Sequence, residues 1–367
     1  MKRMNLLIMI LVILIITQSC GSGKKETLIS TSFQAEIESL MLEKNVPTLG
    51  IAIIENGKLR HTKVFGKLKN STAASDSTIF NSISHSNQGF TKDTPAPDNA
   101  IFNIASLTKP ISALLTLTLV SNGAWDLEEP LYHYWIDPDI KDDPYLKILT
   151  TRHVLTQQSG FDNWRWLNSS NKLAFNFKPG TQCKYSGEGF KYLKLAIEHK
   201  FNTPFEELAD SLLFEPYGMK DTRFLWDENF HKYRYAEEHN KKGEPYKLRK
   251  RIHNASAADD VLTTIKDYGL FAVNVMKASG LTEDIYNDMI NPQAIVKENV
   301  AYGLCWYIKQ NYYEAEAALT HTGGDAGVCT KVIILPESKR GLIIFTNGDN
   351  GFDIIKKVEE DFFASRI

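Results

Sequence analysis

The chain is poor in cysteine, and it has no excess of charge of either sign. Its 367 residues include 4 cysteines, whose spacing does not match a zinc site, and no His-Glu-x-x-His sequence occurs. The formal net charge of −2 at pH 7 gives no support to a nucleic-acid partner. We therefore expect no metal and no nucleic acid. The basic run at residues 247–251 is interpreted as a solvated loop, with contact to an acidic surface as the alternative.

Long apolar runs are scarce, and the exception lies near the N-terminus. Lys2 and Arg3 precede an unbroken apolar run at residues 6–16, which is too short for a comfortable membrane span. Thr-Gln-Ser-Cys follows, and a small residue before a cysteine at this place resembles a bacterial lipoprotein signal. The resemblance implies cleavage before Cys20 and lipid attachment to it, although Thr17 stands where leucine is usual. An ordinary secretory peptide and an uncleaved anchor are the alternatives.

These features divide the chain into a signal peptide (1–20), a tether (21–33) and one domain (34–367). With 43% hydrophobic residues, the domain can bury a large core. We expect an exported lipoprotein, in the periplasm or at the cell surface. Acyl chains on Cys20 would hold it to a membrane leaflet, because each buried methylene contributes about 0.8 kcal/mol. The sequence does not decide which leaflet this is.

The remaining cysteines are Cys183, Cys305 and Cys329. An odd number in an exported protein leaves at least one free thiol. Cys305 and Cys329 both fall in strand-like segments and could pair, a question that the sequence leaves open. A disulfide framework is not expected in a domain with this much core.

Strand signals stand at both ends of the domain. Two apolar, β-rich runs at 49–54 and 59–65 flank the Asn56-Gly57 pair, which is typical of a hairpin. Residues 33–44 have the apolar spacing of a helix. Near the other end the patterns predict strands at 302–308, 328–335 and 341–346 and an amphipathic helix at 352–364.

The middle of the domain is mostly helical. Residues 69–99 are polar and predict a long loop, and from about 124 to 275 the pattern is helical and loop-like. We expect the N-terminal hairpin to complete an antiparallel sheet with the C-terminal strands. The predicted fold is therefore α+β: an antiparallel β-sheet flanked by helices, with a mostly helical inserted subdomain at about 124–275.

A serine three residues before a lysine occurs three times, at Ser22, Ser106 and Ser169. Only Ser106 opens a strongly apolar helical run, at residues 111–120. Pro110 supports this placement, because proline is best tolerated near a helix start. Ser106 is therefore predicted at a helix N-terminus, where backbone N–H groups favour negative charge.

Lys109 lies on the same helix face as Ser106, since residues three apart are neighbours. A serine hydroxyl is a poor nucleophile until a base takes its proton, and a desolvated lysine can do so. No Gly-x-Ser-x-Gly sequence is present, which argues against the other common serine-hydrolase architecture. The structural alternatives to a catalytic pair are that Ser106 is only a helix N-cap and that Lys109 is a solvated helix residue.

Two short motifs follow along the chain, Tyr185-Ser-Gly187 and His321-Thr-Gly-Gly324. Together with the Ser106 motif, they stand in the order found in the serine β-lactamase and penicillin-binding-protein superfamily. The chain resembles the branch of that superfamily that holds class C β-lactamases, D,D-peptidases and esterases. The resemblance extends from about residue 34 to the end, and it implies a serine hydrolase of the β-lactamase/transpeptidase-like fold.

By this resemblance Ser106 is the nucleophile that forms an acyl-enzyme, and Lys109 accepts or relays its proton. Tyr185 is a general base if Lys109 lowers the pKa of its phenol. The backbone N–H groups of Ser106 and Gly324 are implied to form the oxyanion hole. The implied substrate-binding residues are Gly187, His321, Thr322, Gly323 and Gly324. A core role for Tyr185 and a structural role for His321 are the alternatives.

Two departures from the family pattern bear on the substrate. His321 stands where the β-lactamases usually have lysine, and histidine is mostly neutral at pH 7, so attraction for a substrate carboxylate should be weaker. Gly187 stands where the family usually has asparagine, which removes a hydrogen-bond partner for an amide beside the scissile bond. Both changes point away from efficient β-lactam hydrolysis.

We therefore predict a serine hydrolase that needs no cofactor and acts on an ester or a D-amino-acid peptide. A β-lactamase or D,D-carboxypeptidase proper is the first alternative, and a non-catalytic lipoprotein that binds cell-wall peptides is the second. Trp164 and Trp166 are interpreted as surface packing rather than cleft lining. Asn347 is interpreted as structural, with substrate binding as the alternative. Oligomeric state and leaving group are not determined by the sequence.

Overall fold

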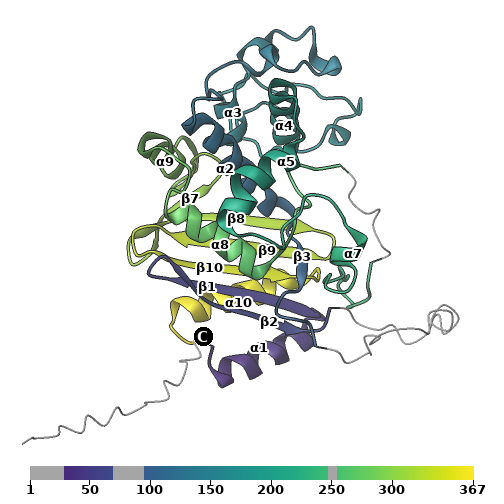
Figure 1. Ribbon diagram of the computed structural model, residues 1–367, viewed down its shortest axis with the longest axis vertical. Helices are drawn as coiled ribbons and strands as arrows, with labels where there is room; N and C mark the ends of the chain where they lie inside the picture. The colour runs from purple at the N-terminus through teal and green to yellow at the C-terminus, as the bar shows by residue number, and fades with distance from the viewer. Residues whose placement is uncertain (1–28, 69–94, 247–253) are drawn as a thin grey trace, which may run out of the picture.

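An eight-stranded antiparallel sheet lies at the centre of the molecule (Figure 1). The computed structural model describes residues 29–68, 95–246 and 254–367. The strand order is β2-β1-β10-β9-β8-β7-β6-β5. These strands are β1 (Thr48–Glu55), β2 (Lys58–Gly66), β5 (Ala294–Lys297), β6 (Val300–Tyr302), β7 (Tyr307–Tyr313), β8 (Glu316–Asp325), β9 (Val328–Leu335) and β10 (Arg340–Thr346).

Side-chain alternation along β1 shows how helices cover both faces of the sheet. Ile51 and Ile53 pack in one core with α1 (Thr31–Glu43) and α10 (Gly351–Phe363). Ala52 and Ile54 point to the other face, in the core that includes α8 (Ile265–Met276). Because successive residues of a strand point to opposite faces, one continuous apolar run serves two cores.

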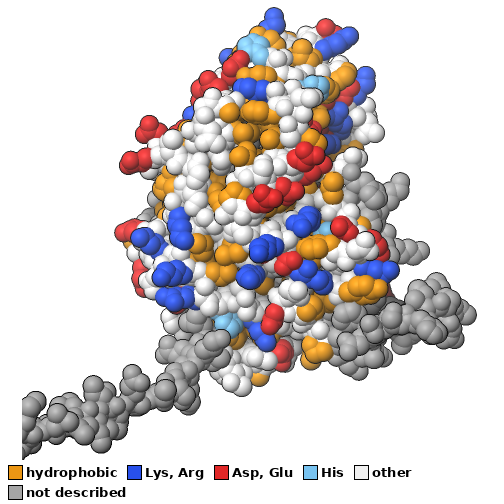
Figure 2. Space-filling view, viewed as in Figure 1, with side chains coloured by type: hydrophobic (Ala, Val, Ile, Leu, Met, Phe, Trp, Pro, Cys, Tyr) orange, Lys and Arg blue, Asp and Glu red, His pale blue; other side chains and the backbone are white. Residues whose placement is uncertain are grey.

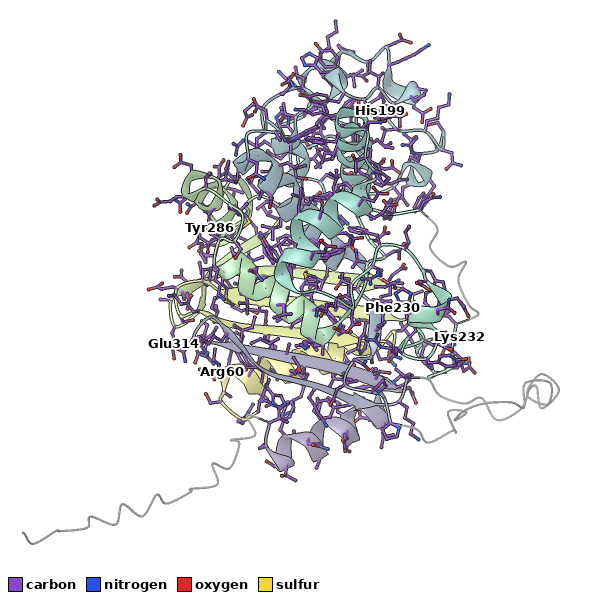
Figure 3. The ribbon with its side chains drawn as sticks, in the orientation of Figure 1. Arg60, His199, Phe230, Lys232, Tyr286 and Glu314 are labelled. Atoms are coloured by element: carbon purple, nitrogen blue, oxygen red, sulfur yellow. The ribbon has the colours of Figure 1, made fainter. Side chains whose placement is uncertain are left out.

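The helices α2 to α5, with the loops around them, stand at one end of this sheet and are called the helical part (Figure 1). In Figure 3, His199 marks the far end of α4, and Arg60 marks β2 at the opposite end of the molecule. A second sheet of two short strands, β3 (Ile101–Asn103) and β4 (Leu262–Thr264), lies close to the helical part. The other helices are α2 (Thr108–Ser121), α3 (Thr151–Leu155), α4 (Gly187–Phe201), α5 (Phe205–Ala209), α6 (Glu215–Tyr217), α7 (Glu228–His231) and α9 (Glu283–Ile290).

The predicted fold class is confirmed. The N-terminal hairpin pairs with the C-terminal strands through β1 and β10, and the turn between β1 and β2 carries positive φ at Asn56 and Gly57. Helix α2 ends at Ser121, and Asn122 caps it as predicted. The segment from 124 to 275 is mostly helix and loop, although β4 also lies within it.

Two expectations need correction, and one open question is answered. The last three residues of the predicted tether, 31–33, already belong to α1, and the Ser30 side chain caps this helix by accepting a hydrogen bond from the backbone N–H of Phe33. The single strand predicted at 302–308 is two strands, β6 and β7, joined by a turn in which Cys305 has a φ of 80°. Cys305 and Cys329 do not pair; both are buried free thiols.

Several predictions fall outside the described residues: the apolar run and Cys20, most of the loop at 69–99, and the basic run at 247–251. Within the described ranges, no helix is long and apolar enough to cross a membrane. On the face shown in Figure 2, basic and acidic side chains are interspersed. This mixture agrees with the small net charge of −2.

Candidate active site

Ser106 lies in a tight turn between β3 and α2. Residues 105–107 form one turn of 3₁₀ helix, and α2 begins at the following residue, Thr108. Ser106 therefore stands two residues before the α-helix rather than within its first turn, and Pro110 is the third residue of α2. The serine is half-buried, so its hydroxyl can be reached from solvent.

Backbone strain is present directly before Ser106. Ala105 has a φ of 45°, in the left-handed region that costs a non-glycine residue about 1–2 kcal/mol. The Asn103 side chain holds this conformation, because its Oδ1 accepts a hydrogen bond from the backbone N–H of Ala105 at 2.8 Å. Asn103 Nδ2 in turn donates to Asp260 Oδ1 at 3.1 Å. The presentation of Ser106 thus depends on a side chain that sequence reasoning missed.

Lys109 is fully buried beside Ser106. Its Nζ donates to Ser106 Oγ at 3.3 Å and to the backbone carbonyl of Ala258 at 2.8 Å. Burial lowers the pKa of the Lys109 ammonium from 10.5 to about 8, and Asp259 opposes that shift. A substantial fraction of Lys109 is therefore neutral near pH 8 and able to accept a proton.

Tyr185 joins the same cluster from the loop that precedes α4. Lys109 Nζ lies 4.6 Å from the centroid of the Tyr185 ring. Burial raises the pKa of the Tyr185 phenol above its usual 10, although a hydrogen bond with Ser106 acts in the opposite direction. The condition for a general-base role, a lowered phenol pKa, is not met. With its raised pKa, the Tyr185 phenol is neutral at pH 7 and is a hydrogen-bonding partner of Ser106.

His321 is buried on β8 and neutral. Its Nδ1 lies 2.9 Å from the backbone carbonyl of Thr322, which makes Nδ1–H the donor. Its Nε2 is buried and has no hydrogen-bond partner among the described residues. Burial, reinforced by the positive charge of Lys109, lowers the pKa of the imidazole to about 3. The ring therefore offers a hydrogen-bond acceptor, and its centroid lies 6.4 Å from that of Tyr185.

Gly323 brings β8 against the Ser106 turn. A Cβ at this position would lie 2.3 Å from the carbonyl oxygen of Ile104 and 2.2 Å from Thr330 Oγ1. Gly323 therefore lets β8 approach the Ser106 turn closely, a contact that the sequence did not predict. Thr322 and Gly324 are exposed on the same strand and so are accessible to a ligand.

Gly187 is the first residue of α4, and its backbone N–H donates to Asn163 Oδ1 at 2.9 Å. A Cβ on Gly187 would lie 2.7 Å from the ring of Trp164. Trp164 is half-buried and stacks on Trp166, with 4.9 Å between the ring centroids. Trp166 is 58% exposed, as expected of a surface residue, whereas Trp164 packs against Gly187 at the beginning of α4.

Asn347 has a structural role. Its side chain is buried, accepts a hydrogen bond from the backbone N–H of Thr48 at 2.7 Å and donates to the Glu237 carbonyl at 2.7 Å. The described residues hold no cluster of histidine, cysteine and carboxylate side chains suited to a metal ion. Cys305 lies near Lys109 as a buried neutral thiol, because burial raises the pKa of its thiol.

The comparisons with known proteins agree with this geometry. Residues 33–360 match the family model described as beta-lactamase. The chain belongs to the beta-lactamase family. The members of this family are serine hydrolases, so the predicted resemblance is confirmed.

Individual relatives are distant. A penicillin-binding protein of Bacillus subtilis is 24% identical over 311 residues, which are 75% of this chain and 67% of that protein. The esterase EstB of Burkholderia gladioli is 27% identical over 160 residues, or 36% of this chain and 40% of the esterase. Among solved structures, the penicillin binding protein from Bacillus halodurans has a TM-score of 0.70 at 18% identity, covering 88% of this chain and 99% of that one. This last likeness establishes the fold.

Proposed function

We propose that this family member hydrolyses a neutral ester through an acyl-enzyme on Ser106, with a D-amino-acid peptide as the second substrate class. The observation that carries the proposal is the contact between Lys109 Nζ and Ser106 Oγ, 3.3 Å apart, with the lysine fully buried. A buried amine with a pKa of about 8 can take the hydroxyl proton as the oxygen attacks.

In the proposed reaction, neutral Lys109 accepts the Ser106 proton while Oγ forms a bond to the substrate carbonyl carbon. The carbonyl oxygen becomes an oxyanion that the backbone N–H groups of Ser106 and Gly324 stabilise, each such donor contributing about 3 kcal/mol. The ester C–O bond then breaks, and the departing alkoxide receives the proton from Lys109, with Tyr185 as a relay. Water then hydrolyses the acyl-enzyme. Neutral Lys109 accepts a proton from water while the water oxygen forms a bond to the acyl carbon. The bond between that carbon and Ser106 Oγ breaks, and Oγ receives the proton from Lys109.

The preference for a neutral substrate follows from His321. β-Lactams and peptide C-termini carry a carboxylate, which a cation at this position would attract. The imidazole is neutral because its pKa is about 3, so it offers no positive charge to a substrate carboxylate. The resemblance to an esterase supports the same preference. A β-lactamase or D,D-carboxypeptidase proper is therefore the alternative function.

The full chain, purified in detergent, tests this proposal with three probes: a serine-reactive phosphonate, p-nitrophenyl butyrate and a β-lactam. We expect a phosphonate adduct by intact mass and release of p-nitrophenol, both lost in Ser106→Ala. A wild-type chain that forms no adduct and releases no p-nitrophenol would refute the enzyme proposal. Faster turnover of the β-lactam than of the ester would refute the substrate preference alone.

We further propose that the enzyme is exported and anchored to a membrane through lipid on Cys20. The support is the sequence of residues 2–20 alone. In a bacterial host, we expect the wild type in the membrane fraction. Its intact mass should exceed the mass of the polypeptide by that of two or three acyl chains with their linking group. Cys20→Ser should remove that mass, and an unchanged mass in this variant would contradict lipid attachment.

A further inference from the structure

Helix α3 ends in a turn that usually holds glycine, and this chain places Gln157 there. The N–H of Gln158 donates to the carbonyl of His153 at 2.7 Å, and the N–H of Gln157 donates to that of Val154 at 3.1 Å. This pair of hydrogen bonds is the Schellman motif, in which the residue after the C-cap takes a left-handed conformation. Gln157 does so with a φ of 59°. Because this conformation costs glutamine free energy that glycine would not lose, we looked for a use of the side chain.

The side chain of Gln157 is fully buried and acts as a hydrogen-bond acceptor. Its Oε1 accepts a hydrogen bond from the backbone N–H of Ser186 at 2.8 Å. This contact sets the orientation of the amide, and it leaves Nε2 buried without a hydrogen-bond partner among the described residues. A buried donor without a partner is costly. The amide is therefore used for its oxygen rather than for its nitrogen.

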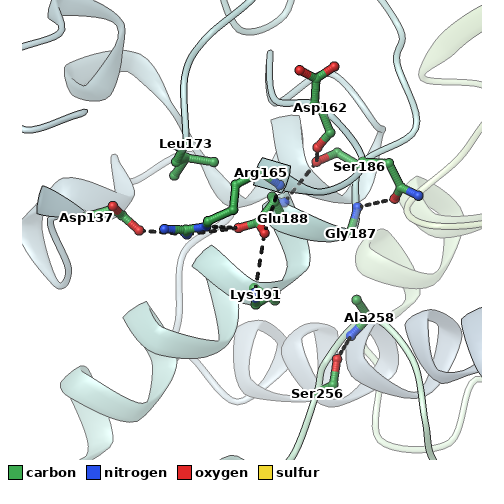
Figure 4. A network of polar contacts seen from close by, with 12 residues as sticks. Asp137, Asp162, Arg165, Leu173, Ser186, Gly187, Glu188, Lys191, Ser256 and Ala258 are labelled. Carbon is green, nitrogen blue, oxygen red and sulfur yellow. Dashed lines mark hydrogen bonds and ion pairs between the residues drawn. The ribbon is translucent and has the colours of Figure 1, made fainter. Parts of the chain in front are cut away.

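The two oxygens of Gln157 hold the backbone on both sides of Tyr185. The backbone carbonyl of Gln157 accepts from the N–H of Lys184 at 2.8 Å, and the side-chain Oε1 accepts from the N–H of Ser186. Lys184 and Ser186 directly precede and follow the tyrosine. Ser186 Oγ adds a further contact, because it donates to the backbone carbonyl of Asp162 at 2.8 Å (Figure 4). One residue thus fixes the stretch of backbone from which the phenol extends.

The position of the Tyr185 phenol matters for the proposed ester hydrolysis. Its hydroxyl is hydrogen-bonded to Ser106, and its ring centroid lies 4.6 Å from Lys109 Nζ. In that reaction the phenol relays the proton from Lys109 to the departing alkoxide. A relay works only over hydrogen-bond distances, so a displacement of ~1 Å can slow the step about 100-fold.

We propose that Gln157 is a positioning residue for Tyr185 and thereby promotes the departure of leaving groups that need a proton. This role rests on the proposed ester hydrolysis at Ser106. An alkoxide is strongly basic and must be protonated as it leaves, whereas p-nitrophenolate is stable at neutral pH and leaves without a proton. Gln157 should therefore matter for alkyl esters and much less for p-nitrophenyl esters.

Two butyrate esters with different leaving groups test this role on the full chain in detergent, ethyl butyrate and p-nitrophenyl butyrate. Their kcat/KM values report acylation of the same serine by the same acyl group, and Ser106→Ala supplies the background rate. Gln157→Met keeps the length of the side chain but removes its acceptor oxygen. We expect it to lower kcat/KM at least tenfold for the ethyl ester and less than threefold for the p-nitrophenyl ester. Gln157→Glu, which keeps an acceptor oxygen, should stay within threefold of wild type for both.

Two further variants control for indirect effects. Gln158→Met makes the same change one residue along the chain, where the side chain accepts from Thr156 Oγ1 at 3.0 Å and donates to the Gly180 carbonyl at 3.3 Å. It should leave the ratio of the two kcat/KM values within twofold of wild type. Gln157→Gly removes the acceptor and also relieves the left-handed strain, so it provides a second variant if Gln157→Met folds poorly. It should show the same selective loss on the ethyl ester.

A double-mutant cycle shows whether Gln157 acts through the tyrosine. Tyr185→Phe removes the relay and should itself lower kcat/KM for the ethyl ester at least tenfold. In that background Gln157→Met should cause less than a threefold further loss, because the hydroxyl that it positions is already absent. A larger further loss would show that Gln157 acts elsewhere and would overturn the positioning role.

The outcomes separate this role from the proposed function. A wild type that hydrolyses neither ester would overturn the proposed function and, with it, the role of Gln157. Hydrolysis of both esters by the wild type, with no selective loss in Gln157→Met and Gln157→Gly, would overturn the role of Gln157 alone.

Discussion

At the scale of single residues, the protonation state of Lys109 governs the proposed chemistry. Below its pKa of about 8 the lysine is charged and cannot accept the Ser106 proton. We therefore expect kcat/KM for p-nitrophenyl butyrate to fall about tenfold per pH unit below pH 8 and to level off above it. His321, with a pKa of about 3, should add no inflection between pH 5 and 8. A flat profile from pH 6 to 9 would show that Lys109 is not the base.

Asn103 is a positioning residue at the same scale. Asn103→Ala removes the acceptor that holds the strained Ala105 and should displace Ser106 Oγ. We expect kcat to fall about 10- to 100-fold with little change in KM, and phosphonate labelling to slow in parallel. Asn274→Ala is the matched control, since this side chain donates to the Leu270 carbonyl on α8. Equal effects of the two substitutions on kcat would contradict a positioning role.

At the scale of elements, the approach of β8 to the Ser106 turn depends on Gly323. Gly323→Ala places a methyl group against the Ile104 carbonyl and the Thr330 hydroxyl, so β8 or the turn must move. We expect a loss of about 1–3 kcal/mol in the free energy of unfolding. Gly324→Ala should change stability far less, because its Cβ would meet only the Phe352 ring, at 3.6 Å. Chemical denaturation measures both variants, and equal losses would contradict the close approach.

The same elements show what a sequence can predict. The hairpin of β1 and β2 and the helix α10 follow from local patterns, and the serine, tyrosine and histidine motifs carry enough residues to place the site. The pairing of Ile101 with Thr264 could not be predicted, because strands of three residues so far apart carry no periodic signal. The Ala258 carbonyl that binds Lys109 is a backbone group that any residue supplies. The contact of Trp164 with Gly187 arises only in the folded chain.

At the scale of the whole molecule, the helical part and the sheet share one core. The buried residues around Trp125 in the helical part are continuous with Val332 and Ile343 on the sheet. The site lies where these parts meet, with Lys109 and Tyr185 from the helical part and His321 from the sheet. A continuous core of this kind predicts that the described parts unfold together rather than one after the other.

Ile51 provides the test of this cooperativity, because it lies fully buried on the other face of the sheet, against α1 and α10. Ile51→Ala should cost about 2–5 kcal/mol and lower the Tm by several degrees. Far-UV circular dichroism reports the whole chain, whereas tryptophan fluorescence reports largely the helical part. We expect both midpoints to fall by the same amount, while Leu42→Ala, 81% exposed on α1, leaves both unchanged. A fluorescence midpoint that stays at its wild-type value would show that the helical part folds without the sheet, and the active site would then be an interface between two independently stable units.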